Sequence, residues 1–218
     1  PTGIPTAQFA GGDGLAFRLR HGIAEDRPVA LFVGRVAHEK NIGFLLEALL
    51  AARQHCPDVL LVIAGEGPAM GELKARVKAL DLQQAVQFIG YLDRQRGLPD
   101  CYAAADVFVF ASRTETQGLV LLEAMAAGLP VIALAEMGTV DILAPGRGAF
   151  SPPAETHAFG QALGHFLSRP LAWRHLADEA PIYAQEWSDV AMAERLAALY
   201  RNLRVQAFIP ENPLGAAV

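Results

Sequence analysis

The segment ETQGLVLLEAMAAG holds two glutamates, Glu115 and Glu123, with seven residues between them. Leucine, alanine and methionine flank Glu123, so its segment has the composition of a buried helix. Burying an ionised carboxylate without a partner is costly, because a protein interior does not replace the lost hydration. Glu123 is therefore expected to be protonated, to be paired with another group, or to be available to a ligand.

The spacing of the two glutamates suits an elongated ligand. If a helix starts near Gly118, Glu123 lies roughly 7–8 Å further along its axis, while Glu115 stays in the preceding loop. The backbone amides of Gly118, Leu119 and Val120 could hold an anion at the helix start. A sugar at Glu115, phosphates at the helix start and a ribose diol at Glu123 would form a nucleotide-sugar site. A structural Glu–Arg or Glu–backbone pair at Glu123 is the alternative.

Two cations, Arg35 and Lys40, bracket a loop in the stretch GRVAHEKNIGFLL, before a helix that begins near Asn41. Cations beside a helix N-terminus suit a phosphate or diphosphate, because the helix dipole and the charged side chains attract the same anion. Alternatively, both are surface charges, with Lys40 paired with Glu39 or Glu47.

Glycines mark three turns that could approach a ligand closely. Gly34 allows a tight exit from the first strand, and Gly65 opens the turn GEGP, which is not the GxGxxG dinucleotide fingerprint. The turn Gly90–Tyr91 could present backbone groups to a base edge. Ordinary structural turns explain these glycines equally well.

The surrounding elements alternate between short apolar runs and helical segments, which predicts an α/β fold with a Rossmann-like, doubly wound, mostly parallel sheet. In such sheets ligands bind outside the carboxyl ends of the strands, where these polar residues fall. The expected strands are Val29–Val33, Leu60–Ala64, Val86–Ile89, Val107–Phe110 and Val131–Leu134. The expected helices are Ile42–Gln54, Met70–Leu80, Arg94–Ala105 and Gly118–Ala127, followed by C-terminal helices near Thr156–Leu167, Leu171–Glu186 and Val190–Leu203.

The chain has 218 residues, of which 52% are hydrophobic, enough for one domain with a real core. A net charge of −5 without any basic run argues against nucleic acid as a partner. No apolar run reaches the roughly 18 residues of a membrane span, and the first residues do not resemble a signal peptide. Cys56 and Cys101 are expected to be reduced thiols of a cytoplasmic protein. The histidines show no metal-site spacing, so no metal is predicted.

Five stretches together resemble the C-terminal, donor-binding domain of retaining glycosyltransferases with the GT-B fold, family 4 (group 1). The resemblance covers roughly residues 28–203, and the Glu-x7-Glu pair followed by AMAAGLPVIA is its most specific part. The matching stretches are LFVGRVAHEKNIGFLLEAL, LVIAGEGP, VQFIGYLDR, CYAAADVFVFASRTETQGLVLLEAMAAGLPVIA and YAQEWSDVAMAERLAALYRNL.

The resemblance implies a role for each site residue. Arg35 and Lys40 would hold the donor diphosphate, Glu115 would contact the transferred sugar, and Glu123 would bind the ribose. The backbone at Gly118, Leu119 and Val120 would contact phosphate and sugar, while Gly90–Tyr91 would border the base. The donor would be a UDP- or GDP-sugar, used as a substrate without a cofactor or metal, because the cations and the helix dipole stabilise the leaving group.

The resemblance also predicts the domain organisation. Residues 1–27 would be a linker and entry into the domain, residues 28–203 the nucleotide-sugar-binding domain, and residues 204–218 a tail. The N-terminal acceptor domain of such enzymes would lie outside this sequence, so this chain alone is expected to bind nucleotide weakly and to transfer no sugar. The full-length enzyme would be cytoplasmic, with peripheral contact at the inner face of the membrane.

One motif departs from the family pattern. Where relatives carry Gly-Gly-x-x-Glu, this chain reads MGTVDIL, with Gly138 and Asp141, which leaves the donor sugar open. The spelling ETQGL, together with PTGI at the start, is similar to members that glycosylate lipids such as diacylglycerol. Two other interpretations are a different GT-B enzyme, such as a nucleotide-sugar epimerase or a phosphorylase, and a non-catalytic flavodoxin-like module.

Overall fold

The computed structural model describes residues 2–206, which fold around a six-stranded parallel sheet with the strand order β3-β2-β1-β4-β5-β6. The predicted α/β, Rossmann-like fold with a doubly wound sheet is confirmed. The strands are β1 (Val29–Val33), β2 (Leu60–Ala64), β3 (Val86–Gly90), β4 (Val107–Phe110), β5 (Val131–Ala133) and β6 (Ala149–Phe150). The two-residue strand β6 was not predicted, because so short an apolar run carries no periodic signal.

The central strands are apolar along their whole length because helices cover both faces of the sheet. Every residue of β2 and β4 is buried, as is typical of parallel strands between two helical layers. In the register, Val29 lies opposite Leu60 and Val33 opposite Ala64. The hydrophobic core is therefore continuous through the sheet.

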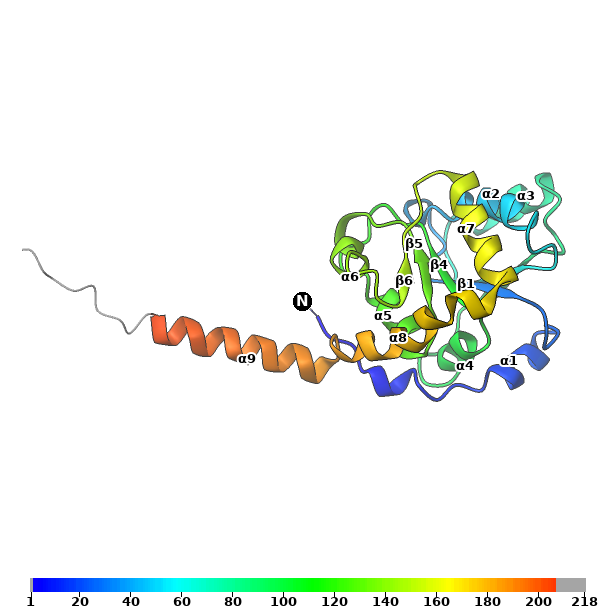
Figure 1. Ribbon diagram of the computed structural model, residues 1–218. Coiled ribbons are helices and arrows are strands. Elements are labelled where there is room, and N and C mark those ends of the chain that lie inside the picture. The colour runs from blue at the N-terminus through cyan, green and yellow to red at the C-terminus, as the bar shows by residue number, and fades with distance from the viewer. Residues whose placement is uncertain (1, 207–218) are drawn as a thin grey trace, which may run out of the picture.

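The helices form two layers, one on each face (Figure 1). Helices α2 (Ile42–Ala52), α3 (Met70–Ala79) and α7 (Thr156–Ser168) cover one face. Helices α1 (Gly14–Arg20), α4 (Gly97–Ala103), α5 (Leu119–Ala126) and α8 (Arg174–Gln185) lie on the other. Helix α6 (Val140–Leu143) precedes β6, and α9 (Asp189–Gln206) extends away from the rest of the protein. Short 3₁₀ helices cover Thr6–Gln8, His38–Lys40, Met137–Thr139 and Pro170–Trp173.

The N-terminal segment is more ordered than a linker. Helix α1 is capped by Asp13, whose side chain accepts a hydrogen bond from the Ala16 amide at 2.9 Å. Phe9 and Phe17 are both buried in the core. Residues 1–27 were predicted to be a linker and entry into the domain, and residues 4–23 of this segment contribute core side chains.

Three predicted helix boundaries differ from the structure by three residues, and the others agree within two. Helix α4 begins at Gly97 and not at Arg94, because the Asp93 carboxylate accepts hydrogen bonds from the amides of residues 95, 96 and 97. The segment expected to be helical from Leu171 begins as a 3₁₀ turn before α8. Helix α9 continues to Gln206, three residues into the predicted tail, and residues 207–218 of that tail lie outside the described residues.

None of the helices within residues 2–206 is both long and apolar enough to cross a membrane. Helix α9, with 18 residues, exposes Leu196, Leu199, Tyr200 and Leu203 on its surface.

Helices α2 and α7 approach closely because α7 carries glycine at its contact points. A Cβ atom at Gly160 would lie 2.1 Å from the carbonyl oxygen of Ala48, and one at Gly164 would lie 2.6 Å from that of Ala52. Both distances are far inside van der Waals contact with backbone atoms that cannot rotate away. This packing fixes α2, and with it the loop that carries Lys40.

We expect Gly160→Ala to lower the free energy of unfolding by about 1–3 kcal/mol, because overpacking forces the two helices apart. Gly71→Ala is the matched control, since nothing lies within 4 Å of the position that its Cβ would take. Urea denaturation should show this control to be neutral or slightly stabilising. Equal effects of the two substitutions would contradict the close-packing account.

Candidate active site

The strand order reverses between β1 and β4, which are neighbours in the sheet although two strands separate them in sequence. At such a switch point the chain leaves the two strands in opposite directions and opens a crevice at their carboxyl ends. The loop after β1 carries Arg35 and Lys40, while the loop after β4 carries Glu115 and leads into α5. The predicted site residues are therefore brought to one crevice.

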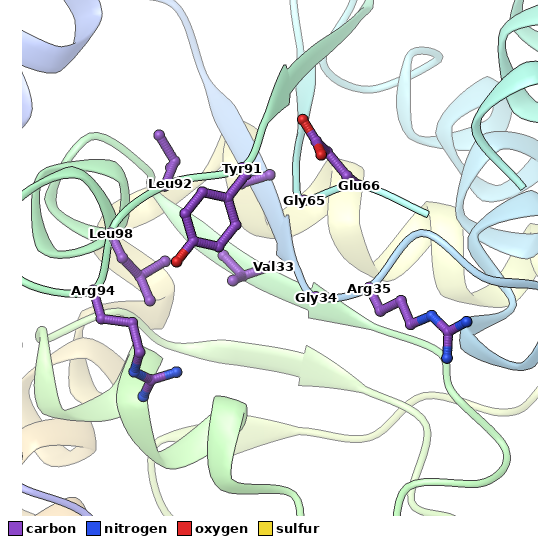
Figure 2. A pocket seen from close by; sticks show the side chains of 10 residues that line it. Val33, Gly34, Arg35, Gly65, Glu66, Tyr91, Leu92, Arg94 and Leu98 are labelled. Atoms are coloured by element: carbon purple, nitrogen blue, oxygen red, sulfur yellow. The ribbon is translucent and has the colours of Figure 1, made fainter. Parts of the chain in front are cut away.

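This crevice, called the switch-point cleft below, has two adjoining parts. They share five lining residues, namely Val33, Gly34, Arg35, Arg94 and Leu98. The first part has a volume of ≈ 340 Å³ and is completed by Ala64, Gly65, Glu66, Tyr91 and Leu92 (Figure 2). The second has a volume of ≈ 430 Å³ and is completed by Lys40, Phe110, Glu115, Gln117, Leu119, Val120 and Glu123. Each part falls within the size range of small-molecule sites.

In the second part, Lys40 and Glu115 form an ion pair, with Lys40 Nζ 2.8 Å from Glu115 Oε2. The other carboxylate oxygen accepts longer hydrogen bonds from the amides of Gln117 and Gly118, at 3.4 and 3.3 Å. Burial acts to raise the pKa of Glu115, but the hydrogen bonds from Lys40 and from Gly118 outweigh it, so the pKa lies below its ordinary value. The alternative partners suggested for Lys40, Glu39 and Glu47, are wrong, and Glu47 pairs with Arg76 instead.

Glu123 lies at the bottom of the cleft, and its side chain is only 8% exposed. One carboxylate oxygen accepts a hydrogen bond from the Tyr102 hydroxyl at 3.1 Å, and the other contacts the Arg94 guanidinium. Burial, and then the neighbouring carboxylate, raise the pKa of Tyr102 well above its usual value, so Tyr102 donates its proton to this bond. The hydrogen bond to Glu123 raises the pKa of Arg94. In this structure Glu123 thus has the Glu–Arg pair that was the alternative to a ribose contact.

Arg94 and Tyr102 are the contacts that the sequence did not predict. Arg94 comes shortly after the Gly90–Tyr91 turn in GYLDR. Its positive charge close to a predicted binding turn was the only sign in the sequence that it belongs to the site. Tyr102 lies on α4 and is fully buried, with its ring edge-to-face with Phe9 at 5.9 Å. A buried tyrosine normally needs a partner for its hydroxyl, but sequence does not show which one.

The predicted glycines differ in their positions. Gly65 lines the cleft, yet its immediate neighbour is the loop after β1, since a Cβ atom there would lie 1.9 Å from the carbonyl oxygen of Gly34. Gly118 caps α5 in the left-handed region with φ 67°, which leaves Leu119 and Val120 as the first residues of the helix. Gly90 accepts a hydrogen bond from the Gly65 amide at 2.7 Å and lies outside both parts of the cleft.

The loop with the departing motif MGTVDIL lies against Glu115. The Gly138 amide donates to the Glu115 carbonyl at 2.9 Å, and a Cβ atom at Gly138 would lie 2.0 Å from the Thr116 carbonyl oxygen. This close packing places the loop beside the predicted sugar contact.

Among residues 2–206, no group of three or more His, Cys, Asp or Glu side chains is arranged to hold a metal ion. The cations of the switch-point cleft come from two loops, with Arg35 and Lys40 in the loop after β1 and Arg94 in the loop after β3. The absence of a metal from the reaction stays a prediction.

The sequence pattern described as "Glycosyl transferases group 1" matches residues 16–186 of this chain. The chain belongs to the group 1 glycosyltransferase family. It is 31% identical over 188 residues to the alpha-D-kanosaminyltransferase of Streptomyces kanamyceticus, covering 85% of this chain and 48% of that protein.

A second member of the family comes from Mycolicibacterium smegmatis, a GDP-mannose-dependent alpha-(1-6)-phosphatidylinositol monomannoside mannosyltransferase. It is 30% identical over 221 residues, covering 94% of this chain and 56% of the relative. This chain thus spans about half the length of the curated relatives that it matches. Its fold matches the crystal structure of Anabaena HepE in complex with UDP with a TM-score of 0.80 and 24% identity, covering 92% of this chain and 56% of that one. The GT-B fold of the family is thereby confirmed.

We expect Glu115→Gln to lower stability at neutral pH by about 1 kcal/mol or less, since the pair with Lys40 is only partly buried. The pKa of Glu115 is lower in the folded chain, so its contribution is present above the ordinary value of 4.5 and is lost as the pH falls through the folded value. Urea denaturation between pH 3 and pH 7 should therefore show the wild-type advantage shrinking toward acid. An advantage that stays constant with pH would contradict this assignment.

Proposed function

We propose that this chain binds a nucleotide-diphosphate sugar and is the donor half of a retaining glycosyltransferase. The observation that carries the proposal is the convergence of Arg35, Lys40, Glu115, Glu123 and the start of α5 on one cleft at the switch point. Two cations and a helix N-terminus suit a diphosphate, while two carboxylates suit the hydroxyls on either side of it.

The proposed donor lies along the cleft from one part to the other. Its base borders Tyr91 in the first part, and its ribose reaches Glu123 between the two parts. The diphosphate contacts Arg35, Lys40 and the amides of Leu119 and Val120, which lack helical partners because they begin α5. The transferred sugar then lies next to Glu115.

In the proposed reaction, the bond between the sugar C1 and the diphosphate oxygen breaks, and the bonding electrons leave with the nucleoside diphosphate. Arg35, Lys40 and the α5 dipole stabilise this negative charge as it develops. An acceptor hydroxyl attacks C1 from the face that the leaving group departs from, and its proton passes to the departing phosphate oxygen. No residue of the described cleft is assigned as a general base.

The relatives support this class of substrate. Anabaena HepE is crystallised with UDP, and the mycobacterial relative is named as GDP-mannose-dependent and as acting on a phosphatidylinositol mannoside. We therefore propose a UDP- or GDP-sugar as the donor and a lipid as the acceptor. The acceptor would be bound mainly by the half of the family enzymes that this chain does not span.

Calorimetric titration with UDP and GDP tests the ribose contact. We expect one of the two nucleotides to bind and Glu123→Ala to weaken that binding about tenfold or more, because hydrogen bonds to a buried carboxylate are lost. Glu47→Ala, an exposed carboxylate on α2 outside the cleft, should leave the affinity unchanged. The proposed function is wrong if neither nucleotide binds the wild-type chain.

The diphosphate contact has a separate test. Arg35→Met should weaken nucleoside diphosphate binding by about tenfold, since a charge-assisted contact is removed, and should leave binding of the free nucleoside unchanged. Arg53→Met, a cation at the far end of α2, is the matched control. Competition binding with the nucleoside, its monophosphate and its diphosphate measures the difference. Equal losses for all three ligands would show that Arg35 supports the fold and does not contact the diphosphate.

A further inference from the structure

Protein groups alone satisfy the carboxylate that is proposed to bind ribose. Tyr102 donates to one oxygen of Glu123, and the Arg94 guanidinium contacts the other. The two partners differ in freedom, because Tyr102 is fully buried whereas the Arg94 side chain is 59% exposed. Arg94 can therefore leave Glu123 by rotating toward solvent, while Tyr102 stays in place.

The backbone of Arg94 is fixed although its side chain is exposed. Its carbonyl oxygen accepts a hydrogen bond from the Gln8 side chain at 2.6 Å. The next three amides are held by Asp93. The guanidinium also lies 6.0 Å from the centre of the Phe9 ring, where it gains a cation–π contact. The backbone of Arg94 is thus held in place where the two parts of the cleft meet, while its side chain can change rotamer.

We propose that Arg94 is an internal competitor of the donor ribose, a latch that occupies Glu123 until the two ribose hydroxyls displace it. This inference rests on the proposed function. A guanidinium and a vicinal diol each donate hydrogen bonds to a carboxylate, so they satisfy the same oxygen in turn. The bond from Tyr102 occupies the other oxygen in both states. Because the ribose hydroxyls replace Arg94 directly, the buried Glu123 carboxylate always has a partner. The free energy needed to separate Arg94 from Glu123 lowers the affinity for the donor by the same amount.

Removal of the latch should tighten binding. We expect Arg94→Met, which keeps an unbranched apolar side chain over Phe9, to bind the ribonucleoside diphosphate about tenfold more tightly, because the ligand then competes only with water for Glu123. Calorimetry with UDP and GDP measures the change. Arg96→Met removes the same charge two residues away and should leave the affinity unchanged. Arg94→Lys keeps a cation that can pair with Glu123, so its affinity should lie between those of the wild type and Arg94→Met.

Two further measurements separate the latch from a merely structural effect. The gain from Arg94→Met should disappear with the 2′,3′-dideoxy form of the same nucleotide, which lacks the diol. It should also disappear in the Glu123→Gln background. An increase that persists in either case overturns the latch, because it would arise without the diol or without the carboxylate.

The remaining outcomes distinguish this inference from the function on which it rests. If the wild-type chain binds the ribonucleotide and Arg94→Met leaves that affinity unchanged or weakens it, the latch is overturned and the donor site stands. If no variant binds either nucleotide, the donor site is overturned, and the latch with it.

Discussion

The adjacency of β1 and β4 is the constraint on which the site depends. Chain order places β2 and β3 on one side of β1, and β5 and β6 on the other side of β4, so the loops after β1 and β4 diverge. No helix can fill the space between two loops that leave in opposite directions, and this space is the switch-point cleft. Arg35 and Glu115 are distant in sequence and meet only because of this strand order. The glycine contacts of α7 with α2 and of Gly65 with Gly34 then hold the loop after β1 in place.

Charge balance within the cleft is the second feature of the account. Three carboxylates and three cations line a partly buried space, and two of the carboxylates, Glu115 and Glu123, each contact one of the cations. The low effective dielectric of such a space strengthens these contacts and makes an unpaired charge costly. The proposed donor, with a negative diphosphate between two groups of hydroxyls, displaces one partner of each pair, since its phosphates attract Arg35 and Lys40 and its hydroxyls bond to the carboxylates. The proposed donor would therefore replace both of these ion pairs with its own contacts.

Five of the six strands and most of the cleft could be predicted from the sequence because they follow from local patterns. Buried parallel strands are continuous apolar runs, and the rule that ligands bind at their carboxyl ends then points to Arg35, Lys40 and Glu115. The buried position of Glu123 was also visible, because apolar residues surround it in its helix. What remained open was whether its partner would be a protein group or a ligand, since a carboxylate can accept from either.

Contacts with partners far along the chain could not be predicted. Arg18 is nearly buried, and its guanidinium donates to the backbone carbonyls of Ala24, Arg27 and Ala104 and pairs with Asp106, an arrangement that depends on the finished fold. Helix α1, which carries Arg18, begins after the capping residue Asp13 but has only seven residues, too few for a clear helical pattern in the sequence. Backbone carbonyls leave no trace in residue types, so tertiary contacts of this kind carry no sequence signal.

The most direct test of the account is a crystal structure of this chain with the nucleoside diphosphate that binds more tightly. The account predicts the diphosphate at the start of α5 between Arg35 and Lys40, with the ribose hydroxyls on Glu123 and with Arg94 turned away from that carboxylate. A nucleotide bound elsewhere on the domain, or one that leaves the Arg94–Glu123 contact in place, would contradict it.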